Sequence, residues 1–238
     1  MSDAERKEMI ALKILKGWQE HGSTIVLSES IRYCYELKEL LEQDCGLLKH
    51  KPRIAVIHGT LSKYTWQVAG TEQNAIRAVQ SGQAVEYRKK GKKFEIKVQQ
   101  YTDEEMKNWQ MSKKKRLETV ERLKNREIDI VFATQLAREG LDVPHLSVLH
   151  MVTPKRGDVS KDRADGSAVE QEVGRVMRPN WSNPGKKCVV YDYVDYNVGV
   201  FKSQYYSRRR VYERLGVKLP RRKSNVDEIE RLLGQIKF

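Results

Sequence analysis

Four residues in the last third of the chain have a spacing that suits phosphate chemistry. Gln171, Gly174, Arg175 and Arg178 occur in the order Gln-x-x-Gly-Arg-x-x-Arg. Residues three or four positions apart share one face of an α-helix, so a helix here would present two guanidinium groups together. Arginines placed against a phosphoryl group in transfer accelerate the reaction by about 10³ to 10⁵. The alternative is an ordinary surface helix that carries two arginines.

A second block, about thirty residues earlier, has the pattern of a strand that delivers polar groups to a ligand. The apolar run 130–133 leads into Thr134, and Gly140 and Asp142 follow. The turn after Thr134 can offer a hydroxyl and backbone N–H groups to a phosphate, and Gly140 permits a tight reversal. We expect Asp142 to point back toward the same cleft. A strand and turn without any ligand is the alternative, and the joint presence of the two blocks disfavours it.

Short apolar strands and amphipathic helices alternate around these blocks. The pattern predicts helices at 4–20, 31–42 and 112–125 and strands at 24–27, 53–57, 129–133, 147–152 and 187–191. Ser30 is the expected N-cap of the second helix. The alternation indicates βαβ units and a parallel sheet covered on both faces. Because ligands bind at the carboxyl ends of such strands, we expect His58, Gly59, Thr134 and the loop after Val152 at one edge.

Two basic segments lie outside this alternation. Residues 84–98 form two alternating runs around a glycine, which predicts an inserted basic β-hairpin whose tip lysines contact phosphates or form a solvated turn. In residues 205–222 arginines are interleaved with tyrosines. This segment suits either a groove for a single strand or a helix that packs its Tyr and Leu face on the sheet with the arginines outward. Residues 225–236 predict one more amphipathic helix.

The composition limits the possible partners and compartments. The formal net charge of the 238 residues is +13, which favours attraction to nucleic acid, although basic residues can also simply keep a surface solvated. The three cysteines include no Cys-x-x-Cys pair, so we expect no structural metal and a reducing compartment. No apolar run approaches the roughly 20 residues of a membrane helix. We therefore expect no membrane partner and a cytoplasmic location, nucleoid-associated or in the host cytoplasm if the source is a phage.

The two blocks, in this order, resemble motifs V and VI of superfamily 2 helicases. Residues 25–28 are similar to motif IV, and residues 55–59 are similar to the strand and turn that follow it. The resemblance covers about residues 23–192, with the hairpin region and the loop 154–167 as departures. It implies an α/β fold: a RecA-like three-layer lobe with a parallel sheet flanked by helices, here with the inserted basic hairpin and C-terminal helices. The expected organisation is an N-terminal helix at 1–22, the lobe at 23–200 and a helical extension at 201–238.

The resemblance also implies roles for individual residues. Arg178 would be the arginine finger, Arg175 would lie beside it on the phosphates, and Gln171 would organise the cleft. The nucleotide would be bound by Gly140, Gly174 and Asp142, the last on the ribose. Nucleic acid would be held through its sugar-phosphate backbone by four residues: Ser28, His58, Gly59 and Thr134.

Half of the machinery for ATP hydrolysis is missing from the sequence. No Gly-x-x-x-x-Gly-Lys-Ser/Thr loop and no Asp-Glu-x-His/Asp box occurs, so ATP and Mg²⁺ would be bound mainly by a first lobe in the same or another chain. We expect the motor lobe of an ATP-dependent DNA or RNA helicase or translocase, inactive alone, that engages a single strand at a duplex junction. A restriction or chromatin-type translocase lobe is a weaker variant. The alternative from another class is a non-enzymatic nucleic-acid-binding or regulatory module with the same fold.

Overall fold

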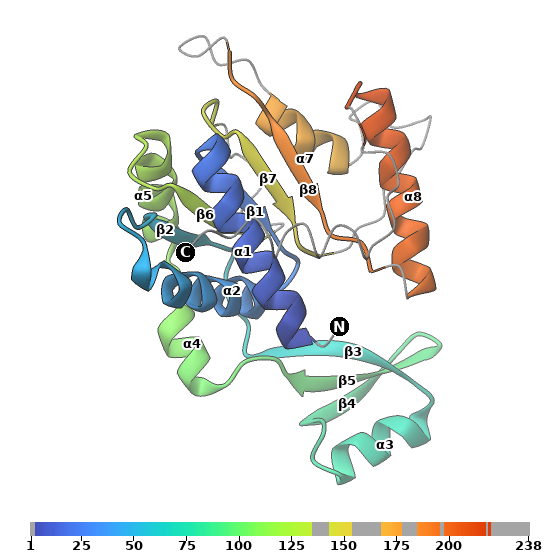
Figure 1. The fold of residues 1–238 in the computed structure, drawn as a ribbon. Coiled ribbons are helices and arrows are strands. Elements are labelled where there is room, and N and C mark those ends of the chain that lie inside the picture. The colour runs from blue at the N-terminus through green and yellow to red at the C-terminus, as the bar shows by residue number, and fades with distance from the viewer. Residues whose placement is uncertain are drawn as a thin grey trace.

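A five-stranded parallel sheet forms the centre of the computed structural model, which describes residues 3–134, 143–153, 168–177, 185–195, 198–217 and 219. Its strand order is β2-β6-β1-β7-β8 (Figure 1). Every neighbouring pair is parallel, as predicted. The strands are β1 (Thr24–Leu27), β2 (Ile54–Ile57), β6 (Ile130–Ala133), β7 (Val148–Met151) and β8 (Val189–Asp192).

Helices cover both faces of this sheet because successive strand residues point to opposite sides. Val26 packs with α1 and α2, whereas Ile25 and Leu27 pack with residues of α5, α7 and α8. The three-layer arrangement is therefore confirmed. The helices are α1 (Asp3–His21), α2 (Ile31–Asp44), the 3₁₀ turn η1 (Cys45–Leu47), α4 (Asp103–Trp109), α5 (Lys113–Lys124), α7 (Ala168–Met177) and α8 (Gly199–Arg214). None of the helices in the described part of the chain is long and apolar enough to cross a membrane.

The N-terminus of α2 is fixed by the predicted cap. The Ser30 hydroxyl accepts a hydrogen bond from the Tyr33 backbone N–H at 3.3 Å. The helix therefore starts immediately after the turn that leaves β1. This position matters because the turn lies at the carboxyl edge of the sheet.

The insertion is larger than the predicted hairpin. Strands β4 (Glu86–Lys90) and β5 (Lys93–Gln99) form that hairpin, but β3 (Tyr64–Gly70) joins it to make an antiparallel sheet of order β3-β5-β4. Helix α3 (Glu72–Gln80) connects β3 to β4 and contacts all three strands. Since an isolated hairpin is marginally stable in water, the third strand and the helix supply the packing that it needs. Figure 1 shows this unit at one end of the molecule, outside the layers around the parallel sheet.

The structure corrects the packing alternative for residues 205–222 in one respect, and the groove for a single strand stays a prediction. Helix α8 buries Val211 and Tyr212, as the packing alternative expects, but it also buries Arg208 to 1% exposure. The Asp192 carboxylate accepts hydrogen bonds from Arg208 at 2.8 and 2.9 Å and from the Tyr212 hydroxyl at 2.8 Å. One arginine thus points inward because β8 ends in a carboxylate. The expected helix at 225–236 and the loop 154–167 lie outside the described residues.

Candidate functional site

The residues predicted to contact nucleic acid follow one row across the parallel sheet. Ile57, Ala133 and Leu27 are aligned partners on β2, β6 and β1, and Met151 continues the row on β7. His58, Thr134 and Ser28 are the next residues of their strands, so they emerge at the same carboxyl edge. The backbone N–H of Thr134 donates to the Ile57 carbonyl at 3.2 Å, and that of Ser28 donates to the Ala133 carbonyl at 3.1 Å. The expected placement at one edge is confirmed.

The Ser28 hydroxyl has an internal role at this edge. It lies 3.0 Å from the Thr153 hydroxyl and accepts a hydrogen bond from the Ser30 backbone N–H at 3.1 Å. The Thr153 hydroxyl also accepts from the Glu29 backbone N–H at 3.2 Å. Together these bonds shape the turn between β1 and α2. Thr153 was not predicted individually; its signal was its position just after Val152.

The His58 side chain is buried beneath the edge rather than presented on it. Its Nδ1 lies 2.7 Å from the Gly59 carbonyl, which can only accept, so Nδ1 carries the proton. Its Nε2 then accepts from the Tyr35 hydroxyl at 3.3 Å. Burial lowers the pKa of His58 and raises the pKa of Tyr35 to about 12. The imidazole is therefore a neutral packing group, and Gly59 is buried next to it.

The hydroxyl of Thr134 differs from that of Ser28. Thr134 is 5% exposed, and its Oγ1 has no hydrogen-bond partner among the residues that the structure describes. Leaving a buried hydroxyl without a partner costs about 1 to 3 kcal/mol, so this atom is suited to a further polar partner. The other residues predicted in this block, Gly140 and Asp142, lie outside the described residues.

Helix α7 separates a buried face from an outward one. Val169, Val173 and Val176 are fully buried in the core, whereas Gln171 is exposed. A Cβ added to Gly174 would meet no described atom within 4 Å. Gln171, Gly174 and position 175 therefore lie on the face turned away from the valines, as the spacing predicts. The Arg175 side chain and all of Arg178 lie outside what the structure describes.

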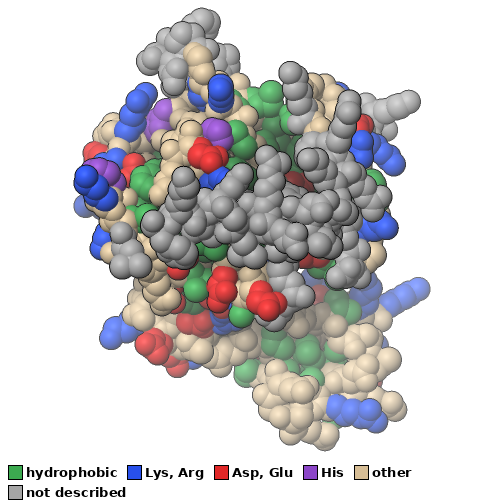
Figure 2. Space-filling view, viewed as in Figure 1, with side chains coloured by type: hydrophobic (Ala, Val, Ile, Leu, Met, Phe, Trp, Pro, Cys, Tyr) green, Lys and Arg blue, Asp and Glu red, His purple; other side chains and the backbone are tan. Residues whose placement is uncertain are grey.

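On the face of the molecule drawn in Figure 2, the described basic side chains do not gather in one patch. In the view of Figure 2, the described Lys and Arg side chains lie mainly around the outline of the molecule. Within the described ranges, no group of three His, Cys, Asp or Glu side chains could hold a metal ion. The site is thus defined by the strand ends and by α7.

Comparison with known proteins agrees with this geometry. Residues 69–180 match the family described as helicase conserved C-terminal domain, and this range includes both sequence blocks. A protein named "Putative helicase 22" from a Sulfolobus islandicus filamentous virus is 32% identical over 100 residues. That match covers 41% of this chain but only 16% of the viral protein, so the chain corresponds to a small part of its relative.

Two solved structures share the fold. The C-terminal domain of the DEAD-box protein Dbp5 is 14% identical with a TM-score of 0.54, over 99% of this chain and 93% of that domain. A variant of S. cerevisiae Dbp5 bound to a variant of Gle1 and IP6 is 15% identical with a TM-score of 0.51, over 97% of this chain and 42% of that one. At these identities the likeness concerns the fold. Residues 69–180 of this chain are therefore similar to a helicase conserved C-terminal domain, and the chain has an α/β RecA-like fold like that of the C-terminal domain of a DEAD-box protein.

Proposed function

We propose that this chain is the C-terminal motor lobe of an ATP-dependent nucleic-acid helicase or translocase. The observation that carries the proposal is the division of α7 into a face of buried valines and an outward face with Gln171 and Gly174. No described atom of the chain requires a glycine at position 174, since an added Cβ would lie in open space. A glycine on an outward face suits the close approach of a second surface, here the first lobe with its nucleotide.

The arginines of this face supply charge to the reaction. Arg178 acts as the finger that neutralises charge on the phosphoryl group in transfer, and Arg175 contacts the phosphates beside it. Gln171 orders the shared cleft, Gly140 lines it, and Asp142 accepts hydrogen bonds from the ribose. Mg²⁺ and the β and γ phosphates belong to the first lobe, because the sequence has no P-loop lysine and no paired metal carboxylates of the DEAD-box kind.

The carboxyl edge of the parallel sheet forms the track for one strand of nucleic acid. The Thr134 hydroxyl, buried and without a described partner, donates to a phosphate oxygen. The side chains of His58 and Ser28 and the backbone N–H groups of Glu29 and Ser30 are engaged within the chain, so among the described residues the proposal depends on the Thr134 hydroxyl as the donor. Contacts to phosphate and sugar fix position without reading the base sequence. Closure and opening of the two lobes would then move the strand.

An arginine variant tests this assignment. The chain is combined with its first lobe, and ATP hydrolysis is measured with saturating single-stranded DNA and, separately, RNA. Arg178→Ala should lower turnover about 10³-fold or more while the affinity for nucleic acid stays unchanged. Arg210→Ala on the exposed side of α8 removes the same charge and serves as the matched control. Turnover retained by Arg178→Ala would remove the finger from the proposal.

A further inference from the structure

The two faces of the inserted sheet differ in chemistry. Register places Phe94, Ile96 and Val98 on one face of the central strand β5. Helix α3 contacts all three strands and buries Ala75 and Ala78. The side chains of Glu95 and Lys97 alternate with these residues and belong to the opposite face. That face is open to solvent, because Val68, the partner of Glu95, is 60% exposed and Lys97 keeps 31% of its side chain exposed.

Aromatic rings and cations alternate across this open face. Register aligns Trp66 of β3 with Lys97 of β5, and Tyr64 lies two residues before Trp66 on the same face. The Arg88 guanidinium of β4 lies over the Trp66 ring, 3.8 Å from its centroid. The Lys97 ammonium lies 5.2 Å from the Tyr64 centroid and 6.0 Å from that of Trp66. The two rings are about 7 Å apart along the strand, given a rise of about 3.3 Å per residue.

The charge of the hairpin is strongly positive. Residues 86–97 contain six basic residues (Arg88, Lys89, Lys90, Lys92, Lys93, Lys97) and two acidic ones (Glu86, Glu95), a net charge of +4. Arg88 pairs with Glu95 at 2.8 Å, and Lys97 pairs with Glu86 at 2.8 Å. The Arg88 side chain is 44% exposed and the Lys97 side chain is 31% exposed. Pairs with this exposure are weak, so phosphates can compete for their cations.

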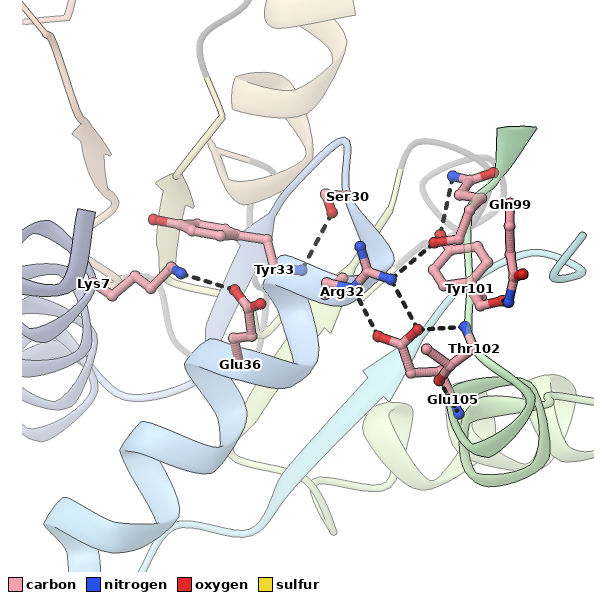
Figure 3. Close-up of polar contacts among 10 residues, drawn as sticks. Lys7, Ser30, Arg32, Tyr33, Glu36, Gln99, Tyr101, Thr102 and Glu105 are labelled. Carbon is pink, nitrogen blue, oxygen red and sulfur yellow. Dashed lines mark hydrogen bonds and ion pairs between the residues drawn. The ribbon is translucent and has the colours of Figure 1, made fainter. Parts of the chain in front are cut away.

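The insertion is anchored beside the carboxyl edge of the parallel sheet. It leaves that edge after Gly59 and returns through α4. Arg32 near the start of α2 donates to the Gln100 carbonyl at 2.8 Å and to both carboxylate oxygens of Glu105 at 2.7 and 2.8 Å (Figure 3). Its guanidinium also lies over the Tyr101 ring, 5.6 Å from the centroid. These contacts join the end of β5 to the turn after β1.

We propose that the open face of β3, β5 and β4 is a second binding surface for single-stranded nucleic acid. Bases stack on Tyr64 and on the Trp66–Arg88 pair, and Lys90, Lys93 and Lys97, which share this face by register, hold the phosphates. Stacking on aromatic rings and guanidinium planes accepts any base, because every base has a π face. This surface extends the proposed function, in which the strand runs along the edge at Thr134, but it rests on different residues.

Binding by the full chain tests the proposal with two oligonucleotides of equal length and charge. One is a fluorescent single strand with bases and the other is its abasic counterpart, and fluorescence anisotropy gives both affinities in DNA and RNA forms. Trp66→Leu should weaken binding of the strand with bases about 5- to 150-fold, the range for loss of one stacked base. Tyr87→Leu, which changes an exposed aromatic residue on the face of Ile96, is the matched control and should leave affinity within about twofold.

The unchanged protein provides a test that does not depend on how a variant folds. It should bind the abasic strand more weakly than the strand with bases, and Trp66→Leu should reduce that difference. Equal affinity of the unchanged protein for the two strands, or equal loss in Trp66→Leu and Tyr87→Leu, would overturn the proposal. Thr134→Val distinguishes the two surfaces: if it leaves affinity intact while Trp66→Leu weakens it, the edge track fails and the inserted surface stands. The converse result removes the inserted surface alone.

Discussion

Arg208 is expected to contribute more to stability than any other arginine of α8 in the described structure. Its side chain is 1% exposed and its partner Asp192 is 11% exposed, so the pair lies in the buried regime. Removing one partner of a buried pair costs about 3 to 5 kcal/mol, because the other charge remains without compensation. Arg208→Met approximately keeps the length of the side chain but removes the two described hydrogen bonds from Arg208 to the Asp192 carboxylate. Of the three described bonds, the carboxylate then keeps the one from the Tyr212 hydroxyl. We expect the free energy of unfolding to fall by that amount.

Urea denaturation followed by circular dichroism measures the effect. Arg209→Met is the matched control, since Arg209 pairs with Glu213 and both side chains are about half exposed, at 49% and 52%. Exposed pairs of this kind contribute about 0.2 to 1 kcal/mol. Adding Asp192→Asn to Arg208→Met should recover part of the loss, because the uncompensated charge disappears. Equal destabilisation by Arg208→Met and Arg209→Met would refute the reasoning.

Three further predictions concern stability. Gly17→Ala should lower the free energy of unfolding in urea by about 1 to 3 kcal/mol, because the new Cβ would lie 3.0 Å from His150 Nε2. Gly199→Ala is the control and should leave it unchanged, because no described atom lies within 4 Å of the new Cβ. Burial lowers the pKa of His150 to about 3, so the free energy of unfolding should decline as pH falls from about 6.5 toward 3, and His150→Gln should flatten that slope; an unchanged slope would contradict it. The hydrogen bonds from Arg32 lower the pKa of Glu105 to about 2. The free energy of unfolding of the unchanged protein should therefore exceed that of Glu105→Gln by its full amount above about pH 4.5, and the difference should vanish as pH falls toward 2. A difference that stays constant with pH would contradict this prediction.

The parallel sheet was predictable because its strands are short, apolar and fully or largely buried. Apolar runs such as 24–27 and 130–133 are too short for a helix, so they predict strands. Ser30 marks the start of the next helix by its capping side chain. Strand β3 was missed because its sequence, Tyr-Thr-Trp-Gln-Val-Ala-Gly, has exposed residues on both sides and lacks a turn signal beside the hairpin. Its pairing with β5 is a tertiary contact that no local pattern announces.

The site was predictable in position but less so in detail. The row of strand ends follows from the parallel sheet, so Ser28, His58 and Thr134 could be placed together from their order alone. The direction of each side chain could not. His58 is turned inward by Tyr35, and Arg208 is turned inward by Asp192; both partners are distant in the sequence. Periodicity reports which face of an element is apolar, but it does not report which polar group finds a buried partner.

The central claim is that this chain completes an ATPase whose other half lies in a first lobe. The most direct measurement is nucleic-acid-stimulated ATP hydrolysis by this chain alone, by the first lobe alone and by the two together. We predict hydrolysis in the combination only, and its loss when the chain carries Arg178→Ala. Hydrolysis by this chain alone, or a combination that binds nucleic acid but stays silent with ATP, would contradict the claim, and the second result would favour a binding module that keeps the lobe fold.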